Sequence, residues 1–326
     1  MSERVRGLKE KYEEYLLGVK GVTGVAIDGS IIILVEKLTP ELRNVLPKTL
    51  DGVPVRIKET GPITLMSFGA VPMRAVYADR TSKYRPAPGG ISVGHPLVTA
   101  GTLTCRALDK VTEKVFGLSN DHVIALDWGE LHVGKVGDSV LQPGPSDGGV
   151  DPDDKLGELL RWIPVKTDGN NLIDAAIFSS EELRKDVLEI GNPSHTVEPR
   201  VGRNVVKSGR SSGVNYGKIT GINATVQVDG GEGMGVCTFK NQIIIEPAIL
   251  FPGDSGSWIG EVDTFNSVGL GFAGSDIVSI ANPALIVEEL LGIEIIPPVP
   301  ALTLSSMLGM WLGSTSIFAA VYYGSG

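Results

Sequence analysis

The decisive stretch of this 326-residue chain is Phe251-Pro-Gly-Asp-Ser255-Gly-Ser257. A proline, two glycines and an acid around one serine predict a tight turn that presents the serine side chain. Gly253 leaves the backbone N–H groups of Gly253 and Ser255 open to an approaching oxyanion, and Gly256 permits a sharp bend. Ser255 is therefore a candidate nucleophile, with the Gly253 and Ser255 amides as candidate oxyanion donors. Alone, such a motif is more often an ordinary loop.

Two other stretches supply what a serine nucleophile needs. A histidine follows an apolar strand in the stretch Leu118-Ser-Asn-Asp-His122-Val. One acid lies inside another apolar strand, in the stretch Leu172-Ile-Asp174-Ala-Ala-Ile-Phe178. A serine hydroxyl reacts only when a base removes its proton, and imidazole has a suitable unperturbed pKa. An acid in an apolar strand needs a partner, and His122 is the obvious one. The order His122, Asp174, Ser255 predicts one constellation, with Asp174 orienting the imidazole.

The composition favours many short strands. The chain has 42 glycines and 20 prolines, which favour strands joined by turns over long helices. Between about residues 91 and 291, short β-branched segments alternate with Gly, Asn, Asp and Pro clusters, which is typical of a sandwich or barrel. The predicted strands are 102–108, 115–118, 172–178, 204–207, 218–228, 242–246 and 267–273. A terminal helix is expected over 284–291, with Asn282 as its N-cap and Pro283 at its first position.

The first 62 residues predict a small α/β domain. Its expected elements are a helix over 3–17, a hairpin of strands 22–27 and 31–36, a short helix over 40–45 and a strand over 53–59. Such a domain suits a pro-region, an inhibitory domain or a permanent interaction module, and these alternatives stay open. Residues 63–90 carry few periodic signals and are expected to be a linker. Its basic residues Arg74, Arg80 and Arg85 mark one candidate processing region.

About 60% of the chain, from residue 91 to 291, resembles the chymotrypsin-like serine proteases of the PA clan, and its motifs are most similar to bacterial streptogrisins and alpha-lytic protease. Besides the three stretches above, Val206-Lys-Ser-Gly-Arg-Ser-Ser-Gly-Val-Asn-Tyr216-Gly is similar to a segment that in those enzymes carries two cysteines around a basic residue and Ser-Gly. Val206 and Tyr216 stand at the cysteine positions, so that disulfide is absent here.

The resemblance implies a mainly β fold of two antiparallel six-stranded barrels within a protease domain over 91–296. Barrel 1 would span about 91–195 and carry His122 and Asp174, while barrel 2 would span about 196–292 and carry Ser255. It implies a serine endopeptidase that cuts polypeptide substrates through an acyl-enzyme, without metal or organic cofactor. A catalytically silent binding or scaffold protein of the same fold is the alternative, because fold alone does not establish activity.

The resemblance also names substrate-binding candidates. Residues 269–275, Gly-Leu-Gly-Phe-Ala-Gly-Ser, resemble the strand that lines the primary specificity pocket, which makes Phe272, Ala273 and Gly274 candidates. Ile249 lies six positions before Ser255, where trypsin-like enzymes carry an acid. We therefore expect no preference for Lys or Arg before the cut.

The net charge argues against a nucleic-acid-binding protein, and the amino-terminal residues argue against classical secretion. The formal net charge is −9 without a basic run, which disfavours binding to nucleic-acid phosphates. Cys105 and Cys237 are expected to be buried free thiols. The charged amino-terminal residues lack the apolar run of a signal peptide. We therefore expect a cytoplasmic or membrane-associated protein rather than a classically secreted one.

The last segment, 297–326, is a hydrophobic tail. Residues 301–323 form a run of 23 without a charge, which is long enough to span a bilayer as a helix. Frequent Ser and Thr and the lack of flanking basic residues argue against a span. A membrane anchor, a segment packed on the protein or on a second copy, and a loose tail all remain open.

Overall fold

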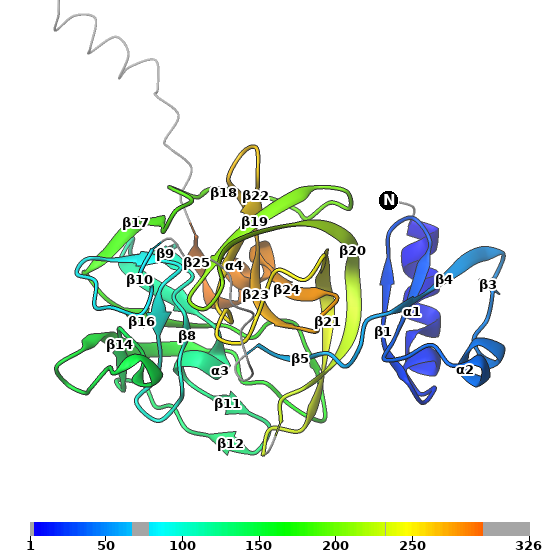
Figure 1. Ribbon diagram of the computed structural model, residues 1–326, viewed down its shortest axis with the longest axis horizontal. Coiled ribbons are helices and arrows are strands. Elements are labelled where there is room, and N and C mark those ends of the chain that lie inside the picture. The colour runs from blue at the N-terminus through cyan, green and yellow to red at the C-terminus, as the bar shows by residue number, and fades with distance from the viewer. Residues whose placement is uncertain (1–2, 67–77, 232, 296–326) are drawn as a thin grey trace, which may run out of the picture. The chain divides into compact units, whose positions relative to one another are not determined.

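The computed structural model describes residues 3–66, 78–231 and 233–295. Strands dominate the described residues (Figure 1), and the predicted mainly β class is confirmed. The helices are α1 (Glu3–Leu17), α2 (Pro40–Val45), α3 (Asp121–Ile124) and α4 (Ala284–Leu291), with one 3₁₀ turn at Pro145–Asp147. The predicted helices over 3–17, 40–45 and 284–291 are therefore present.

Six strands in the second half of the chain form a closed antiparallel ring, as predicted for barrel 2. They are β19 (Asn204–Gly209), β20 (Gly213–Asp229), β21 (Val236–Glu246), β22 (Trp258–Glu261), β23 (Asn266–Gly274) and β24 (Ser279–Pro283). They pair in the order β20-β19-β22-β23-β24-β21, and β21 pairs with β20 to close the ring. Closure leaves no unpaired edge within the ring.

The first barrel contains a six-stranded sheet, one strand of which follows barrel 2 in the chain. Its order is β13 (Ser139–Leu141), β14 (Lys155–Trp162), β16 (Ala176–Ser179), β10 (Val115–Ser119), β9 (Cys105–Asp109) and β25 (Ile293–Glu294). The hairpin of β7 (Ser92–Val93) and β8 (Gly101–Thr102) reaches β13 through a bridge between Gly94 and Leu141. Because β25 follows barrel 2 in sequence, barrel 1 is not confined to 91–195.

Other short strands pair with one another or with strands of barrel 2. A hairpin joins β11 (Asp127–Trp128) to β12 (Leu131–His132). β15 (Asn170–Asn171) pairs with β21, and β18 (Ser194–Thr196) pairs with β23. β17 (Leu183–Val187) pairs with β6 (Ala87–Gly89). Cys105 and Cys237 are buried free thiols, as predicted.

The amino-terminal residues form the predicted α/β unit, and its sheet continues into barrel 2. Its strands are β1 (Val22–Ile27), β2 (Ile31–Val35), β3 (Thr49–Leu50) and β4 (Val53–Glu59). β1 pairs with β2 on one edge and with β20 on the other (Figure 1). Gly24 permits the second pairing, because a Cβ there would lie 2.8 Å from the Thr225 carbonyl oxygen.

A buried polar network fixes α1 against barrel 2. Lys9 Nζ donates to Thr225 Oγ1 at 2.5 Å, and Thr225 Oγ1 donates to Glu13 Oε2 at 2.7 Å. Lys9 also pairs with Glu13, which in turn binds Lys240 at 2.8 Å. Burial lowers the pKa of Lys9. Charges this deeply buried require partners, so the network ties the orientation of α1 to β20 and β21.

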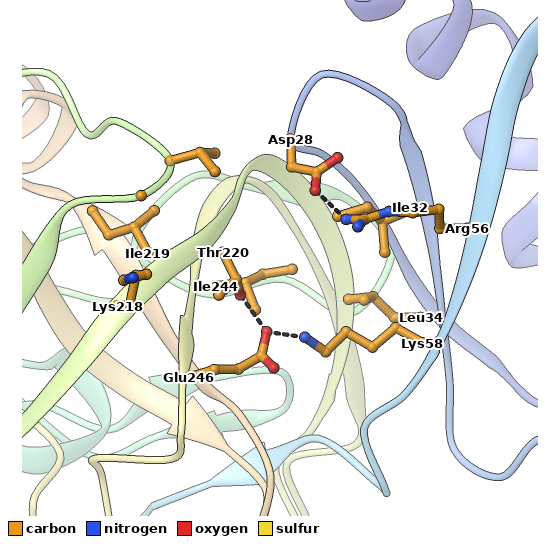
Figure 2. Close-up of a pocket in the computed structure, with 12 residues that line it drawn as sticks. Asp28, Ile32, Leu34, Arg56, Lys58, Lys218, Ile219, Thr220, Ile244 and Glu246 are labelled. Atoms are coloured by element: carbon orange, nitrogen blue, oxygen red, sulfur yellow. Dashed lines mark hydrogen bonds and ion pairs between the residues drawn. The ribbon is translucent and has the colours of Figure 1, made fainter.

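A pocket of about 280 Å³ lies between the amino-terminal unit and barrel 2 (Figure 2). Lys58 of β4 pairs with Glu246 of β21 across it, and Thr220 donates to the same carboxylate. Arg56 pairs with Asp28 at the neighbouring turn. None of the predicted site residues lines this pocket, so it is not the candidate active site.

The expected linker, 63–90, is instead built into the fold where it is described. β5 (Thr64–Leu65) pairs with β20 and β23, and β6 pairs with β17. Arg80 is buried and binds Gly90, Ser208 and Glu189. This stretch shows few periodic signals because its strands have only two or three residues. Arg74 lies outside the described residues.

The predicted tail 297–326, with its uncharged run 301–323, also lies outside the described residues. Within the described ranges, no helix has both the length and the apolarity to cross a membrane.

Replacing Thr225 with valine tests the network under α1. The change removes the hydroxyl that joins Lys9 to Glu13, and we expect it to lower the free energy of unfolding by about 1–3 kcal/mol. Urea unfolding measures the loss. The exposed Thr167→Val is the matched control and should stay near wild type. Equal stability of the two variants would contradict a structural role for the network.

Candidate active site

The turn around Ser255 requires both of its glycines. Gly253 has φ +89° and Gly256 has φ +93°, a region that residues with a side chain rarely adopt. A Cβ on Gly253 would lie 2.1 Å from Ser211 Oγ, and one on Gly256 would lie 2.0 Å from the Thr102 carbonyl oxygen. The motif is therefore set both by backbone conformation and by close contact.

A buried ion pair between β19 and this turn holds the turn in place. Lys207 Nζ lies 2.6 Å from Asp254 Oδ2, and both side chains are fully buried. Lys207 also donates to Ser212 Oγ at 2.6 Å. Asp254 Oδ1 accepts the N–H groups of Ser211 and Ser212, each at 3.0 Å, and Oδ2 accepts that of Phe251 at 3.1 Å. A buried carboxylate this well satisfied holds residues 251–257 against the Lys207–Ser212 segment.

His122 and Asp174 meet as predicted. His122 lies in α3, immediately after β10, and its Nδ1 contacts Asp174 Oδ2. The His122 backbone N–H also donates to Asp174 Oδ1 at 3.2 Å. The prediction that Asp174 lies inside a strand is wrong, because β16 begins at Ala176. An aspartate whose carboxylate binds a backbone N–H suits a loop better than a strand ladder.

Two asparagines that the sequence analysis did not assign to the site hold Asp174 in place. Asn120 Nδ2 donates to the Asp174 carbonyl at 2.6 Å, and Asn282 Oδ1 accepts the Asp174 N–H at 3.1 Å. Asn282 is not the N-cap of α4; that position is Pro283. The position of Asn120 two residues before His122 could have suggested the first contact. The second joins residues 108 positions apart and had no local signal.

Asp121 adds a second buried acid beside Asp174. Burial raises its pKa well above the ordinary value of 3.8, and the charge of Asp174 raises it further. Both carboxylate oxygens of Asp121 accept the Asp127 N–H, at 3.3 and 3.1 Å. Asp121 therefore keeps its proton to a higher pH than an exposed aspartate does, which limits the negative charge behind His122.

The two halves of the site meet at Gly256. A Cβ there would lie 2.6 Å from Ser119 Oγ, three residues before His122, and Thr102 N–H donates to the Ser255 carbonyl at 2.7 Å. The Ser255 hydroxyl donates to the Phe272 carbonyl at 3.2 Å. His122 Nε2 is buried and has no hydrogen-bond partner among the described residues. Ser255 and His122 are therefore not hydrogen-bonded to each other in this arrangement.

The predicted substrate-binding residues all lie beside the chain's own segment 63–66. Ala273 pairs with Leu65 and Gly274 with Thr64, antiparallel, and the Phe272 carbonyl accepts the Met66 N–H at 3.2 Å. Ile249 is buried in the same hydrophobic cluster as Met66. The Gly253 N–H, predicted as an oxyanion donor, donates to the Met66 carbonyl at 2.5 Å.

The described residues contain no group of three or more His, Cys, Asp or Glu side chains arranged to hold a metal ion.

Comparison with known proteins gives similarity in fold. No family model matches the chain, and no curated protein matches it. Among solved structures, the Cellulomonas bogoriensis chymotrypsin is 15% identical (TM-score 0.42) and the Nocardiopsis protease NAPase is 17% identical (TM-score 0.44). Thermobifida fusca protease A is 16% identical (TM-score 0.43). Each alignment covers 64% of this chain and 96–97% of the other. At these TM-scores the similarity assigns neither a family nor an activity to this chain.

Replacing Lys207 with methionine tests the anchor of the turn. The change leaves the Asp254 carboxylate buried without its cation, and we expect it to lower the free energy of unfolding by about 3–5 kcal/mol. Urea unfolding is the measurement, with the exposed Lys110→Met as control. The double variant Lys207→Met/Asp254→Asn should recover part of the loss. No recovery would show that lost packing, rather than the unpaired charge, causes the instability.

The Asp121→Asn variant tests the raised pKa. At Asp121 alone, the folded wild type binds more protons than the unfolded chain between pH 3.8 and the raised pKa of this group. This group's contribution to the free energy of unfolding therefore falls as pH rises through that window. The variant should lack this fall. Urea unfolding from pH 4 upward gives the difference between the two proteins, and parallel curves would contradict the assignment.

Proposed function

We propose that this chain is a serine endopeptidase that hydrolyses peptide bonds through an acyl-enzyme intermediate. One observation carries the proposal: a peptide carbonyl, that of Met66, lies at the Gly253 N–H, while the Met66 N–H and the Ser255 hydroxyl share one acceptor, the Phe272 oxygen. A peptide backbone is thereby held between an oxyanion donor and a hydroxyl nucleophile. The buried pair of His122 and Asp174 supplies the general base that such a hydroxyl requires.

In the proposed reaction, the Ser255 hydroxyl turns from the Phe272 oxygen toward His122 Nε2, which needs rotation about one side-chain bond. His122 removes the proton as Ser255 Oγ attacks the substrate carbonyl carbon. Asp174 keeps the imidazole in the tautomer with its proton on Nδ1 and stabilises the imidazolium.

Backbone donors stabilise the transition state. The Gly253 and Ser255 N–H groups would hold the tetrahedral oxyanion, because charge develops on that oxygen only as the bond to Ser255 forms. His122 then gives its proton to the leaving amine, and water releases the acyl group by the same steps in reverse order.

A fluorophosphonate probe tests the nucleophile. The Met66→Asp variant, in which a buried charge expels residues 63–66 from the site, should become labelled at Ser255. Adding Ser255→Ala should abolish labelling, and adding His122→Ala should make it far slower because no base assists the attack. Hydrolysis of a peptide with methionine before the cut should fall by about 10⁴–10⁶ when Ser255→Ala is added to Met66→Asp. Adding Ser146→Ala, which replaces an exposed serine, should leave both measurements unchanged.

A binding or scaffold protein is the competing function, and the full burial of Ser255 is the observation that favours it. Peptide binding with no labelling of any variant in which the site is open would establish that function instead.

A further inference from the structure

The segment that precedes the undescribed residues 67–77 lies in the site as a substrate would. β5 adds to β23 as an antiparallel strand, with Thr64 opposite Gly274 and Leu65 opposite Ala273. It is held on its other side by β20, where the Asp229 N–H donates to the Ile63 carbonyl at 3.1 Å. Addition of an extended strand to a sheet is a common mode of peptide recognition.

The backbone of Met66 is held at both of its polar groups. Its N–H donates to the Phe272 carbonyl at 3.2 Å, and its carbonyl accepts the Gly253 N–H at 2.5 Å. The first contact continues the β5–β23 pairing by one residue, and the second places the carbonyl at the predicted oxyanion donor. Met66 is therefore the residue whose carbonyl carbon is presented for attack.

The side chain of Met66 fills an apolar pocket. Met66 is 5% exposed and belongs to a buried cluster with Ile249 and Leu250. Its Cε lies 3.3 Å from the position that a Cβ on Gly274 would take. Glycine at 274 thus leaves room for the end of a long unbranched side chain. Methionine fits such a site because it is flexible and apolar, whereas an ionised side chain would be buried without a partner.

Residues 63–66 occupy the site and cover the proposed nucleophile. Ser255 has no exposed surface and His122 is 2% exposed. A hydrolytic site that acts on other proteins must open to them, so residues 63–66 have to leave or be exchanged before an external peptide can bind.

We infer that the chain cleaves its own peptide bond after Met66, and that residues 63–66 inhibit the site until the cut segment is displaced. This inference rests on the proposed endopeptidase function and specifies its substrate class: peptides with methionine or a similar unbranched apolar residue before the cut.

The chemistry balances with water as the sole co-reactant. Ser255 Oγ bonds to the Met66 carbonyl carbon as the bond to the nitrogen of residue 67 breaks. The serine proton passes through His122 to that nitrogen, which becomes a new amino terminus. Water then cleaves the Met66–Ser255 ester, which gives a Met66 carboxylate and restores the Ser255 hydroxyl.

Contacts outside the site bind the cleaved fragment to the rest of the chain. The network of Lys9, Glu13, Thr225 and Lys240 and the pairing of β1 with β20 do not involve the bond after Met66. Ser275 Oγ also donates to the Thr60 carbonyl. Residues 1–66 should therefore remain bound after cleavage and continue to occupy the site as a product.

The same structure disfavours processing at Arg80 or Arg85. Arg80 is buried, and Arg85 binds the carbonyl oxygens of Tyr84 and Asp154 together with Gln142. Neither residue pairs with β23 in the way that Leu65 does.

Incubation of the purified full chain tests the inference, with intact mass and amino-terminal sequencing as measurements. We expect fragments that end at Met66 and begin at Ser67, formed at a rate independent of protein concentration. Ser255→Ala should stay intact. Met66→Leu should be cut at a similar rate because it conserves side-chain volume. Met66→Asp should be cut at least about 100-fold more slowly because its charge would be buried. Leu97→Asp, with the same charge at an exposed position, should be cut like the wild type.

The fluorophosphonate probe separates failure of this inference from failure of the proposed function. In Met66→Asp the segment is expelled, so Ser255 should be labelled although the chain is uncut. Self-cleavage after Met66 would be overturned if this variant is labelled while the wild type stays intact, is cut elsewhere, or is cut at a rate that depends on protein concentration. The endopeptidase proposal would then still stand. If Met66→Asp keeps the wild-type circular dichroism spectrum and neither protein is labelled or cut, the endopeptidase proposal itself fails. Cut wild-type protein should elute from a sizing column as one species and separate in urea; separation without urea would contradict retention of the fragment.

Discussion

The buried ion pair of Lys207 and Asp254 is the interaction on which the site depends. It ties the end of β19 to the residue before Ser255, and the Asp254 carboxylate also accepts the amides of Ser211 and Ser212. Two charges with no exposed surface are tolerated only when their hydrogen bonds are satisfied. Because these bonds come from two segments of barrel 2, the turn has one arrangement, and the Gly253 N–H points to a fixed place. A turn held by solvent-exposed contacts would not fix the direction of this N–H so closely.

Contacts between the amino-terminal unit and barrel 2 determine where residues 63–66 lie. β1 extends the sheet of barrel 2, the network under α1 locks that extension, and the chain then runs along the end of β23 to Met66. An accessory domain joined by a loose linker would present its carboxyl end at low effective concentration. Here β5 pairs with both β20 and β23, and these pairings place Met66 at Gly253. This placement explains why Ser255 and His122 are covered.

Several features followed from local patterns. Apolar spacing predicted α1, turn chemistry predicted the hairpin of β1 and β2, and the glycine-flanked serine predicted the turn at Ser255. The contact of His122 with Asp174 followed from chemistry, because a buried acid needs a partner and only a few residues can serve. The positioning asparagines did not follow. Asn120 and Asn282 act on Asp174 from distant parts of the chain, and no periodic pattern marks such a contact.

By itself the sequence determined the many short strands, the amino-terminal α/β unit and the three residue types of the proposed catalytic machinery, and its motifs carried the resemblance that implied two barrels. The strands and the unit depend on short-range periodicity and on backbone preferences of glycine and proline. The three residue types depend on the needs of a hydroxyl nucleophile. The tertiary structure alone decided that residues 63–66 belong to the site rather than to a linker. Strands of two residues carry too few side chains to show a period, and their pairing with β20 and β23 joins residues more than 150 positions apart. It also decided that Met66 fills the apolar pocket, because only folding brings Ile249 and Gly274 to its side chain and Gly253 to its carbonyl.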